Sequence, residues 1–286
     1  MGAFVESLEH VPFGDVEALE EACKRRRPAA FFVEPIQGEG GIRVPPDSYL
    51  RQASLVCHKH GCLLVVDEIQ TGLGRTGRMF ATEYGQVLPD VLLLGKALSG
   101  GCVPIATAMM TDDVWKRAFA GPERCHLNAS TFAGGLLAVT AALETLAVLE
   151  DEVLAARASN VGAILMKGLQ ELAARHEALS EARGRGLLMG IEFKPPSGLA
   201  GLGVPRWARE GLHAQVIATL LLRDHGILTQ TCGLAQRVLR VEPPLVVSEA
   251  EIGRFLDALD RALAACPSYS SAAIGAFRKR VLRKDL

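Results

Sequence analysis

Short apolar runs alternate with helical patterns in the first third of the chain, and this alternation constrains the fold more than any other feature. The runs Ala29–Val33, Leu63–Val66 and Val91–Leu94 are almost wholly apolar, which is typical of strands buried on both faces of a parallel sheet. A helical pattern over Asp47–His60, ended by Gly61, separates the first two runs. Strands that alternate with helices predict an α/β fold with a mostly parallel sheet.

The pattern changes after Thr131 into long helices followed by a mixture of short strands and helices. Alanine- and leucine-rich helices are expected over Leu136–Leu149 and Val153–Leu172. The later predicted strands are Leu187–Phe193, Ile227–Thr229 and Val238–Val241, and the later predicted helices are Trp207–Asp224 and Glu249–Ala264. We therefore expect residues 1–154 to form part of a large domain, and residues 155–286, with a joining helix, to form a smaller α+β domain.

The charge balance and the cysteines limit the classes of partner. The chain has 31 basic and 32 acidic residues, so it has no overall field that favours nucleic acid or an anionic membrane. Its apolar stretches are far shorter than the roughly 20 residues that cross a bilayer. Seven cysteines without a repeated close spacing fit free thiols better than disulfides. We expect a cytoplasmic protein that binds small molecules or copies of itself.

Polar side chains follow each of the three predicted strands. The segments are Glu34–Gly41, Asp67–Gly72 and Gly95–Gly101, and the last contains Lys96. The carboxyl ends of parallel strands meet at one edge of the sheet, where ligands bind. A lysine in a desolvated pocket loses its proton more readily and attacks an aldehyde, and a carboxylate such as Asp67 pairs with a protonated pyridine nitrogen. Each residue alone is more often an ordinary solvated charge, but together they indicate pyridoxal 5'-phosphate (PLP) chemistry.

Five segments resemble the motifs of class III aminotransferases of the ornithine-, acetylornithine- and putrescine-like group, in the family's order. They read VEPIQGEGG, DEIQTGLGRTG, LLLGKALSGG, STF and LRVEPPL, and they begin at Val33, Asp67, Leu92, Ser130 and Leu239. The similarity extends from about Pro12 to about Ala264. It implies a PLP-dependent transferase of fold type I, present here as the C-terminal part of the large cofactor-binding domain and the small domain.

The resemblance assigns roles to residues near the strand ends. Lys96 would hold PLP as a Schiff base and, once released, would move a proton between the substrate carbon and the cofactor. Asp67 would pair with the pyridine nitrogen. Ile69 would pack against one face of the ring, and Gln70 would hydrogen-bond the phenolic oxygen. No metal is implied.

Three further residues take roles from the same resemblance. Thr131 would bind the cofactor phosphate from the neighbouring subunit, which implies a homodimer with a shared active site; judged alone, it could cap the following helix. Arg240 would grip a substrate carboxylate through a bidentate pair; judged alone, it could form a surface salt bridge. Glu39 would pair with Arg240 when no carboxylate is bound, so that one pocket accepts both an ω-amine and an α-amino acid.

The chain departs from the family pattern at its front. Family members carry a long segment before the position that matches Pro12, and this segment supplies a phosphate-binding loop and an aromatic ring over the cofactor. Residues Met1–Gly14 contain no such glycine-rich loop. We therefore expect a fragment or alternative start of a longer enzyme, or another chain that supplies the rest. A smaller departure is Ala133–Leu136, where the family more usually has glycine, glycine, asparagine and proline.

The resemblance implies transfer of an amino group from an ω-amine or amino acid donor to a 2-oxo acid. Decarboxylases and aminomutases of the same family use the same lysine and aspartate, so those reactions stay open. A chain without half of the phosphate site could also serve only as a dimerisation or interaction module.

Two other motifs allow rival interpretations. Gly72–Gly77 matches the GxGxxG pattern of dinucleotide-binding loops, but it does not directly follow its strand, and no clear helix comes after it. Cys57–Cys62 contains two cysteines and two histidines, yet no second pair of metal ligands lies at a familiar spacing. We expect Cys57 and Cys62 to lie in the core and the histidines to face solvent.

Overall fold

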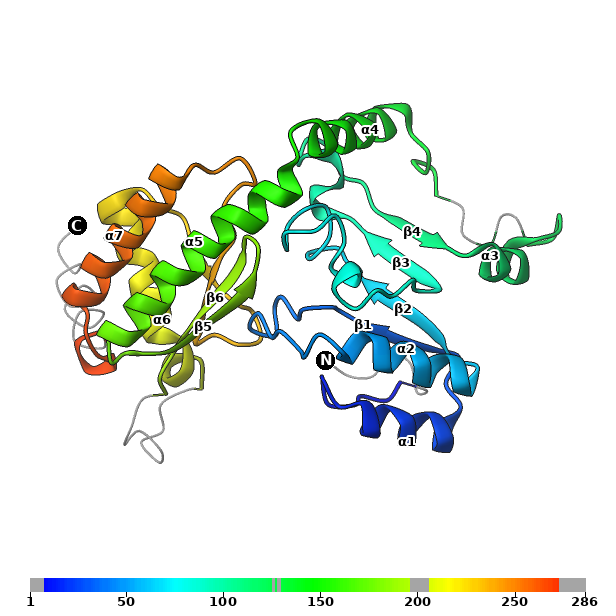
Figure 1. The fold of residues 1–286 in the computed structure, drawn as a ribbon, viewed down its shortest axis with the longest axis horizontal. Coiled ribbons are helices and arrows are strands. Elements are labelled where there is room, and N and C mark those ends of the chain that lie inside the picture. The colour runs from blue at the N-terminus through cyan, green and yellow to red at the C-terminus, as the bar shows by residue number, and fades with distance from the viewer. Residues whose placement is uncertain (1–7, 125–126, 128–129, 196–205, 273–286) are drawn as a thin grey trace, which may run out of the picture. The chain divides into compact units, whose positions relative to one another are not determined.

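The structure is a computed structural model that describes residues 8–124, 127, 130–195 and 206–272 (Figure 1). These residues form two compact units. The first contains the residues up to Pro35, Pro45–Gln70 and Phe80–Leu146, and the second contains Ile36–Val44, Thr71–Met79 and the residues from Ala147 onward. Two short segments from the first part of the chain therefore belong to the second unit. The domain boundary expected after residue 154 stays a prediction.

A four-stranded sheet forms the centre of the first unit. Its strands are β1 (Ala30–Val33), β2 (Leu63–Asp67), β3 (Val91–Leu94) and β4 (Thr107–Met110), in that spatial order. β1, β2 and β3 are parallel, whereas β4 joins β3 antiparallel. The helices that begin here are α1 (Val16–Arg26), α2 (Tyr49–His60), α3 (Asp112–Phe119) and α4 (Leu136–Asp151), with the 3₁₀ helices η1 (Ala81–Tyr84) and η2 (Lys96–Ser99). The predicted α/β class with a mostly parallel sheet is confirmed.

Local chemistry fixes the ends of the two helices that cover this sheet. α1 begins after Asp15, whose Oδ1 accepts a hydrogen bond from a backbone N–H of the first turn at 2.8 Å. α2 ends at Gly61, whose φ of 66° is a left-handed conformation that glycine adopts without strain. The two helices pack on each other (Figure 1). Leu19, Tyr49 and Val66 lie in the same buried core, which anchors β2 behind its carboxyl end.

The second unit is built on an antiparallel sheet. Its strands, in spatial order, are β5 (Leu179–Arg185), β6 (Leu188–Phe193), β8 (Val238–Val241) and β7 (Gln230–Thr231). Its helices are α5 (Leu154–Arg175), α6 (Arg206–His225) and α7 (Glu249–Ala265). α7 begins with a capping box, in which Ser248 Oγ accepts from the Glu251 N–H while the Glu251 carboxylate accepts from the Ser248 N–H. This unit combines an antiparallel sheet with helices, and the smaller α+β domain expected over residues 155–286 stays a prediction.

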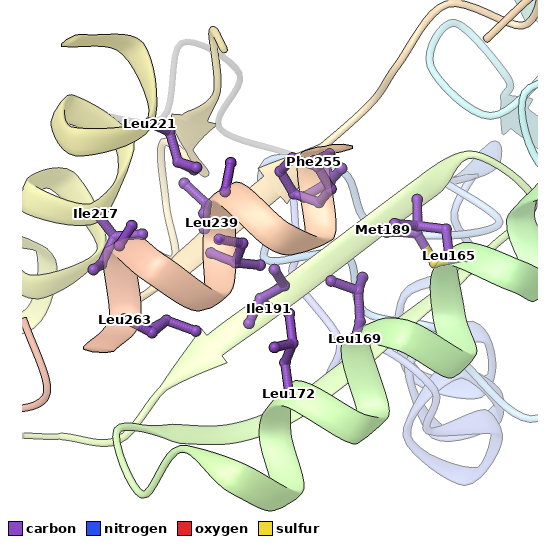
Figure 2. Packing of buried hydrophobic residues seen from close by; sticks show 14 of the residues in the cluster. Leu165, Leu169, Leu172, Met189, Ile191, Ile217, Leu221, Leu239, Phe255 and Leu263 are labelled. Carbon is purple, nitrogen blue, oxygen red and sulfur yellow. The ribbon is translucent and has the colours of Figure 1, made fainter. Parts of the chain in front are cut away.

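The two faces of the antiparallel sheet bury different partners, because side chains alternate along each strand. On one face, Ile191 of β6 and Leu239 of β8 pack among apolar side chains of α5, α6 and α7 (Figure 2). On the other face, Leu188 and Val238 pack with Ile42, which belongs to the first of the two short segments. The sheet is therefore covered by helices on one side and by a loop on the other.

Two strands and one α-helix escape prediction, and few of their side chains are buried. β5 reads LSEARGR and lies at a sheet edge, β4 has exposed side chains at Thr107–Met109, and α3 buries no side chain. The strand expected at Ile227–Thr229 forms instead at Gln230–Thr231. Edge strands and surface helices need few buried residues, so period-based reasoning finds them least well.

Within the described ranges, no helix combines the length and the apolar character needed to cross a membrane. The six cysteines that the structure describes are all free thiols. This agrees with the free thiols expected from the sequence.

Candidate active site

Lys96 follows β3 at the carboxyl end of the strand, separated from it by Gly95 alone. It is the first residue of η2, and its φ is 43°, in the left-handed region that residues other than glycine rarely adopt. Such a conformation costs about 1–3 kcal/mol, so the surrounding fold fixes the direction in which this lysine leaves the strand. Its Nζ donates a hydrogen bond to Oε1 of Gln70 at 2.7 Å. The side chain is exposed, so the expected desolvated pocket is not built by the part of the chain described.

Asp67 is the last residue of β2 and pairs in register with β3. Its side chain is half-buried, and its Oδ1 accepts a hydrogen bond from the Ile69 N–H at 2.9 Å. A Cβ added to Gly95 would lie 3.5 Å from Ile69 Cγ2, so the absent side chain of this glycine leaves room beside Ile69. Because β2 and β3 are parallel, the carboxylate and Lys96 lie at the same edge of the sheet.

Glu68 is a buried carboxylate that sequence reasoning does not single out. Its side chain is 1% exposed, and its Oε1 accepts a hydrogen bond from the Thr82 N–H at 2.8 Å. Its own N–H donates to the Leu93 carbonyl at 3.0 Å, which extends the pairing of β2 and β3 past the strand. Glu68 thereby ties the turn that carries Asp67 and Ile69 to η1. No local pattern distinguishes it from a solvated charge.

Thr131 lies in an exposed turn before α4. The Ala133 N–H donates to the Ser130 carbonyl at 3.1 Å, which closes the turn around it. α4 begins at Leu136 and is preceded directly by Gly135. Thr131 is therefore too far from the helix start to cap α4, and the alternative capping role is wrong.

Arg240 and Glu39 form an ion pair inside the second unit. Arg240 lies on β8 with a side chain that is 9% exposed, and its Nη1 donates to Glu39 Oε1. The other oxygen, Oε2, accepts a hydrogen bond from the Gly233 N–H at 2.6 Å. The structure thus contains the pair that the family resemblance implies, and Arg240 is not an exposed surface charge.

Glu242 is a second carboxylate on the same guanidinium. Its Oε2 accepts from Arg240 Nε at 2.9 Å. Arg75 lies close to this carboxylate and donates to the Leu187 carbonyl at 3.2 Å and to the Pro243 carbonyl at 2.5 Å. Burial lowers the pKa of the Arg75 guanidinium, and the Glu242 charge opposes that shift. Glu242 could have been predicted from the sequence. It stands two residues after Arg240, and side chains two apart along a strand project from the same face.

The rival motifs have structural roles. Gly72–Gly77 forms a series of turns, and the next element is a 3₁₀ helix, so the context for a dinucleotide-binding loop is absent, as expected. A Cβ on Gly186 would lie only 2.3 Å from the carbonyl carbon of Thr76, which shows how closely the turn between β5 and β6 packs on this segment. Gly186 has a φ of 56°, so glycine serves both needs there.

The cysteine and histidine cluster is also structural. Cys57 and Cys62 are buried in the core of the first unit, as predicted. His58 is exposed, but His60 is half-buried with its Nε2 3.6 Å from Glu20, so the prediction for this second histidine is wrong. The described residues contain no group of three or more side chains that could hold a metal.

Similarity to solved structures identifies the class of protein to which this fold belongs. The ornithine aminotransferase from Toxoplasma gondii superposes with a TM-score of 0.78 and 40% identity, over 90% of this chain and 55% of that one. The acetylornithine aminotransferase from Elizabethkingia anophelis gives a TM-score of 0.76 and 32% identity, over 89% of this chain and 59% of that one. The chain has the fold of type I PLP-dependent transferases.

The family follows from the sequence comparisons. Residues 5–263 match the model of class III aminotransferases, and the chain belongs to this family. The aminotransferase PigE of Serratia sp. (strain ATCC 39006) is 35% identical over 285 residues, which cover 88% of this chain and 33% of that protein. The chain thus spans a third of this relative's length and little more than half of the Toxoplasma enzyme.

The residues at the sheet edge fit PLP, the cofactor of this family. The Toxoplasma enzyme holds PLP at partial occupancy in its active site. Here a primary amine and a side-chain amide follow two adjacent parallel strands, a half-buried carboxylate ends one of these strands, and Lys96 contacts Gln70. A covalent anchor, a partner for a pyridinium and a partner for a phenolic oxygen are the groups that the cofactor needs.

Proposed function

We propose that the chain acts in a PLP-dependent transaminase, as the C-terminal portion of the catalytic unit. The reaction would move an amino group from an ω-amine or amino acid donor to a 2-oxo acid. The observation that carries this proposal is the contact between Lys96 and Gln70 at the sheet edge where Asp67 ends the neighbouring strand. Family membership supports it.

The chain's own groups would share the work as follows. PLP supplies an aldehyde and a ring that accepts electrons. Lys96 Nζ would anchor the cofactor and afterwards carry the proton to and from the substrate carbon. Asp67 would keep the ring nitrogen protonated because its carboxylate stabilises the positive charge. Ile69 would support one ring face, and Gln70 would orient the ring through its amide.

Substrate binding would fall to Arg240 and Glu39. The Arg240 guanidinium matches a carboxylate in a bidentate pair, and its partner Glu39 would leave when such a substrate binds. With an ω-amine end in the pocket, the ion pair would stay closed. The existing pair supports this role because it shows that Glu39 can reach Arg240 without any rearrangement.

The proposed assembly is a homodimer in the cytoplasm with an active site shared between subunits. Thr131 would contribute to the phosphate site of the neighbouring subunit, and its exposed position leaves it accessible. The first half of α4 exposes Leu136 by 82%, Leu137 by 73% and Leu143 by 62%, which fits a surface that is covered in an assembly. The free thiols fit a reducing compartment.

The experiment is an absorbance titration of the purified chain with PLP, followed by borohydride reduction and mass analysis of the modified peptide. The expected result is a saturable signal and a cofactor tag on Lys96. The variant Lys96→Ala should lose both, whereas Lys116→Ala, a change in α3, should keep both. Asp67→Ala should bind the cofactor more weakly. A tag on other lysines with Lys96 unmodified would overturn the assignment, and a folded chain that binds no PLP would favour an interaction module.

A further inference from the structure

A row of paired residues crosses the antiparallel sheet of the second unit. Arg183 of β5 pairs with Gly190 of β6, and Gly190 pairs with Arg240 of β8. Residues directly opposite each other in antiparallel strands project from the same face of the sheet. The two arginines therefore stand on one face, on either side of a residue that has no side chain.

The segment Ile36–Val44, here called the Glu39 loop, lies on this face. Gln37 and Arg43 close the loop with two backbone hydrogen bonds of 3.1 Å. Ile42 is completely buried, and a Cβ added to Gly190 would lie 3.0 Å from Ile42 Cβ. The missing side chain of Gly190 is thus what lets the loop reach the sheet between the two arginines.

Arg183 binds the backbone of the loop directly. Its Nε donates to the Gly41 carbonyl at 2.9 Å and to the Ile42 carbonyl at 3.2 Å, and its Nη2 donates to the Gly41 carbonyl at 2.6 Å. Its Nη1 donates to Glu192 Oε2 at 2.6 Å and also pairs with Glu181. The side chain is 19% exposed. A single guanidinium therefore joins the loop to β5 and β6.

The bonded carbonyls belong to the part of the loop with unfavourable backbone angles. Ile42 has a φ of 51°, a left-handed value that a β-branched residue rarely adopts, and Gly41 has a φ of 106°. Such a conformation persists only where the surroundings hold it. The hydrogen bonds from Arg183 and the packing of Ile42 on Gly190 supply that support.

The other side of the loop carries Glu39. The Glu39 carbonyl accepts from the Leu234 N–H at 3.1 Å, and its carboxylate is divided between the Gly233 N–H and Arg240. Glu39 reaches Arg240 because the loop is fixed two residues further on by Arg183. A carboxylate held in place competes for a cation more effectively than a mobile one, because its effective concentration is higher.

We propose that Arg183 is a positioning residue that sets how tightly Glu39 closes on Arg240. By fixing the loop, it sets the balance between a closed ion pair and an Arg240 that is open to a substrate carboxylate. This inference rests on the proposed function of the Glu39 and Arg240 pair. It makes Arg183 a determinant of selectivity between donors that present an ω-amine end and donors that present a carboxylate end.

The first test measures the loop itself and requires neither cofactor nor activity. Hydrogen exchange of peptides that cover residues 36–44 is compared in the wild-type chain, Arg183→Gln and Arg237→Gln. Arg237 is the matched control, since its Nη2 bonds Glu192 Oε1 at 3.2 Å on the same face but its hydrogen bonds do not involve the loop. We expect exchange about tenfold faster in Arg183→Gln, because charge-assisted hydrogen bonds to the loop are lost, and wild-type exchange in Arg237→Gln.

The second test measures how open Arg240 is. Calorimetry with glutarate as a carboxylate probe should give several-fold tighter binding to Arg183→Gln than to the wild type or Arg237→Gln, and none to Arg240→Ala. Arg183→Lys should restore part of the wild-type behaviour. Gly190→Ala tests the loop from its other contact without removing a charge, and it should move both measurements in the same direction.

Hydrogen exchange tests the positioning role of Arg183, and glutarate binding tests its effect on selectivity. Unchanged exchange in both Arg183→Gln and Gly190→Ala would overturn the positioning role. Faster exchange with unchanged glutarate affinity, or with no glutarate bound by any variant, would overturn the effect on selectivity. Failure of the chain to bind PLP would count against the proposed function and would leave the exchange result standing.

Discussion

Arg240 forms ion pairs with two carboxylates, and Glu242 is the one to which the family resemblance assigns no role. Glu39 is proposed to leave when a substrate carboxylate binds, whereas Glu242 follows β8 directly and its Oε2 lies 2.9 Å from Arg240 Nε. A permanent carboxylate reduces the attraction of Arg240 for a carboxylate on a substrate. Glu242→Gln should therefore bind glutarate several-fold more tightly than the wild type, measured by calorimetry. Glu249→Gln, a change in the first turn of α7, is the control, and equal affinity in the two variants would contradict the idea.

His213 should make stability depend on pH. Burial lowers the pKa of its imidazole, and its Nε2 lies 2.8 Å from the Cys266 carbonyl. The folded state therefore binds fewer protons than the unfolded state once the pH falls below the ordinary histidine pKa of about 6.5, so the free energy of unfolding should decrease there as the pH falls. His213→Gln should show a smaller decrease between about pH 7 and 5 in urea denaturation. The same slope in His213→Gln and wild type would exclude this contribution, and exposed His58→Gln serves as the control.

Residues at strand ends were predictable, and residues that act through distant partners were not. Lys96 and Asp67 stand out because a buried apolar run ends just before each of them. Arg183 has no such signal: its partner Gly41 lies 142 positions earlier in the chain. The exposure of Lys96 could not be predicted from its neighbours in the sequence either, because a pocket is formed by segments that are far apart in the chain.

α5 and the turn between β5 and β6 pack together where each has a glycine, Gly162 in the helix and Gly186 in the turn. A Cβ on Gly162 would lie 2.1 Å from the Gly186 carbonyl oxygen, and backbone cannot move aside as a side chain can. Gly162→Ala should lower the free energy of unfolding by about 1–3 kcal/mol, measured by urea denaturation. Gly253→Ala in α7 meets nothing within 4 Å and should instead add up to about 1 kcal/mol. Destabilisation of equal size in both variants would show that close packing is not the cause.

The helices and buried strands could be predicted from the periodicity of apolar residues, whereas the polar edge strands could not. The helix predicted over Glu249–Ala264 forms over Glu249–Ala265, since a capping box and an apolar stripe agree on its limits. β5 could not be found in the same way because its charged residues are stabilised by pairing with β6, not by their own pattern. Its Arg183 is nevertheless the residue that ties the Glu39 loop to the sheet.

The two compact units are discontinuous in sequence, which no local pattern reveals. The Glu39 loop and Thr71–Met79 leave the α/β part of the chain and pack in the second unit. They follow β1 and β2 of the first unit, whereas the segment after β3, which contains Lys96, stays in the first unit. The motifs around Glu39 and Asp67 therefore contain proposed site residues and also connect β1 and β2 to segments that pack in the second unit.

The proposed shared site gives a prediction for the whole assembly. If Thr131 completes the phosphate site of the neighbouring subunit, a mixed dimer of a Lys96→Ala chain and a Thr131→Ala chain contains one site with both changes and one site with neither. Each variant alone should bind little PLP, because every site carries one defect. Co-expressed chains with different tags, purified through both tags, should regain up to about half of the wild-type cofactor per dimer. No recovery, or a monomer by light scattering, would contradict a site shared between subunits.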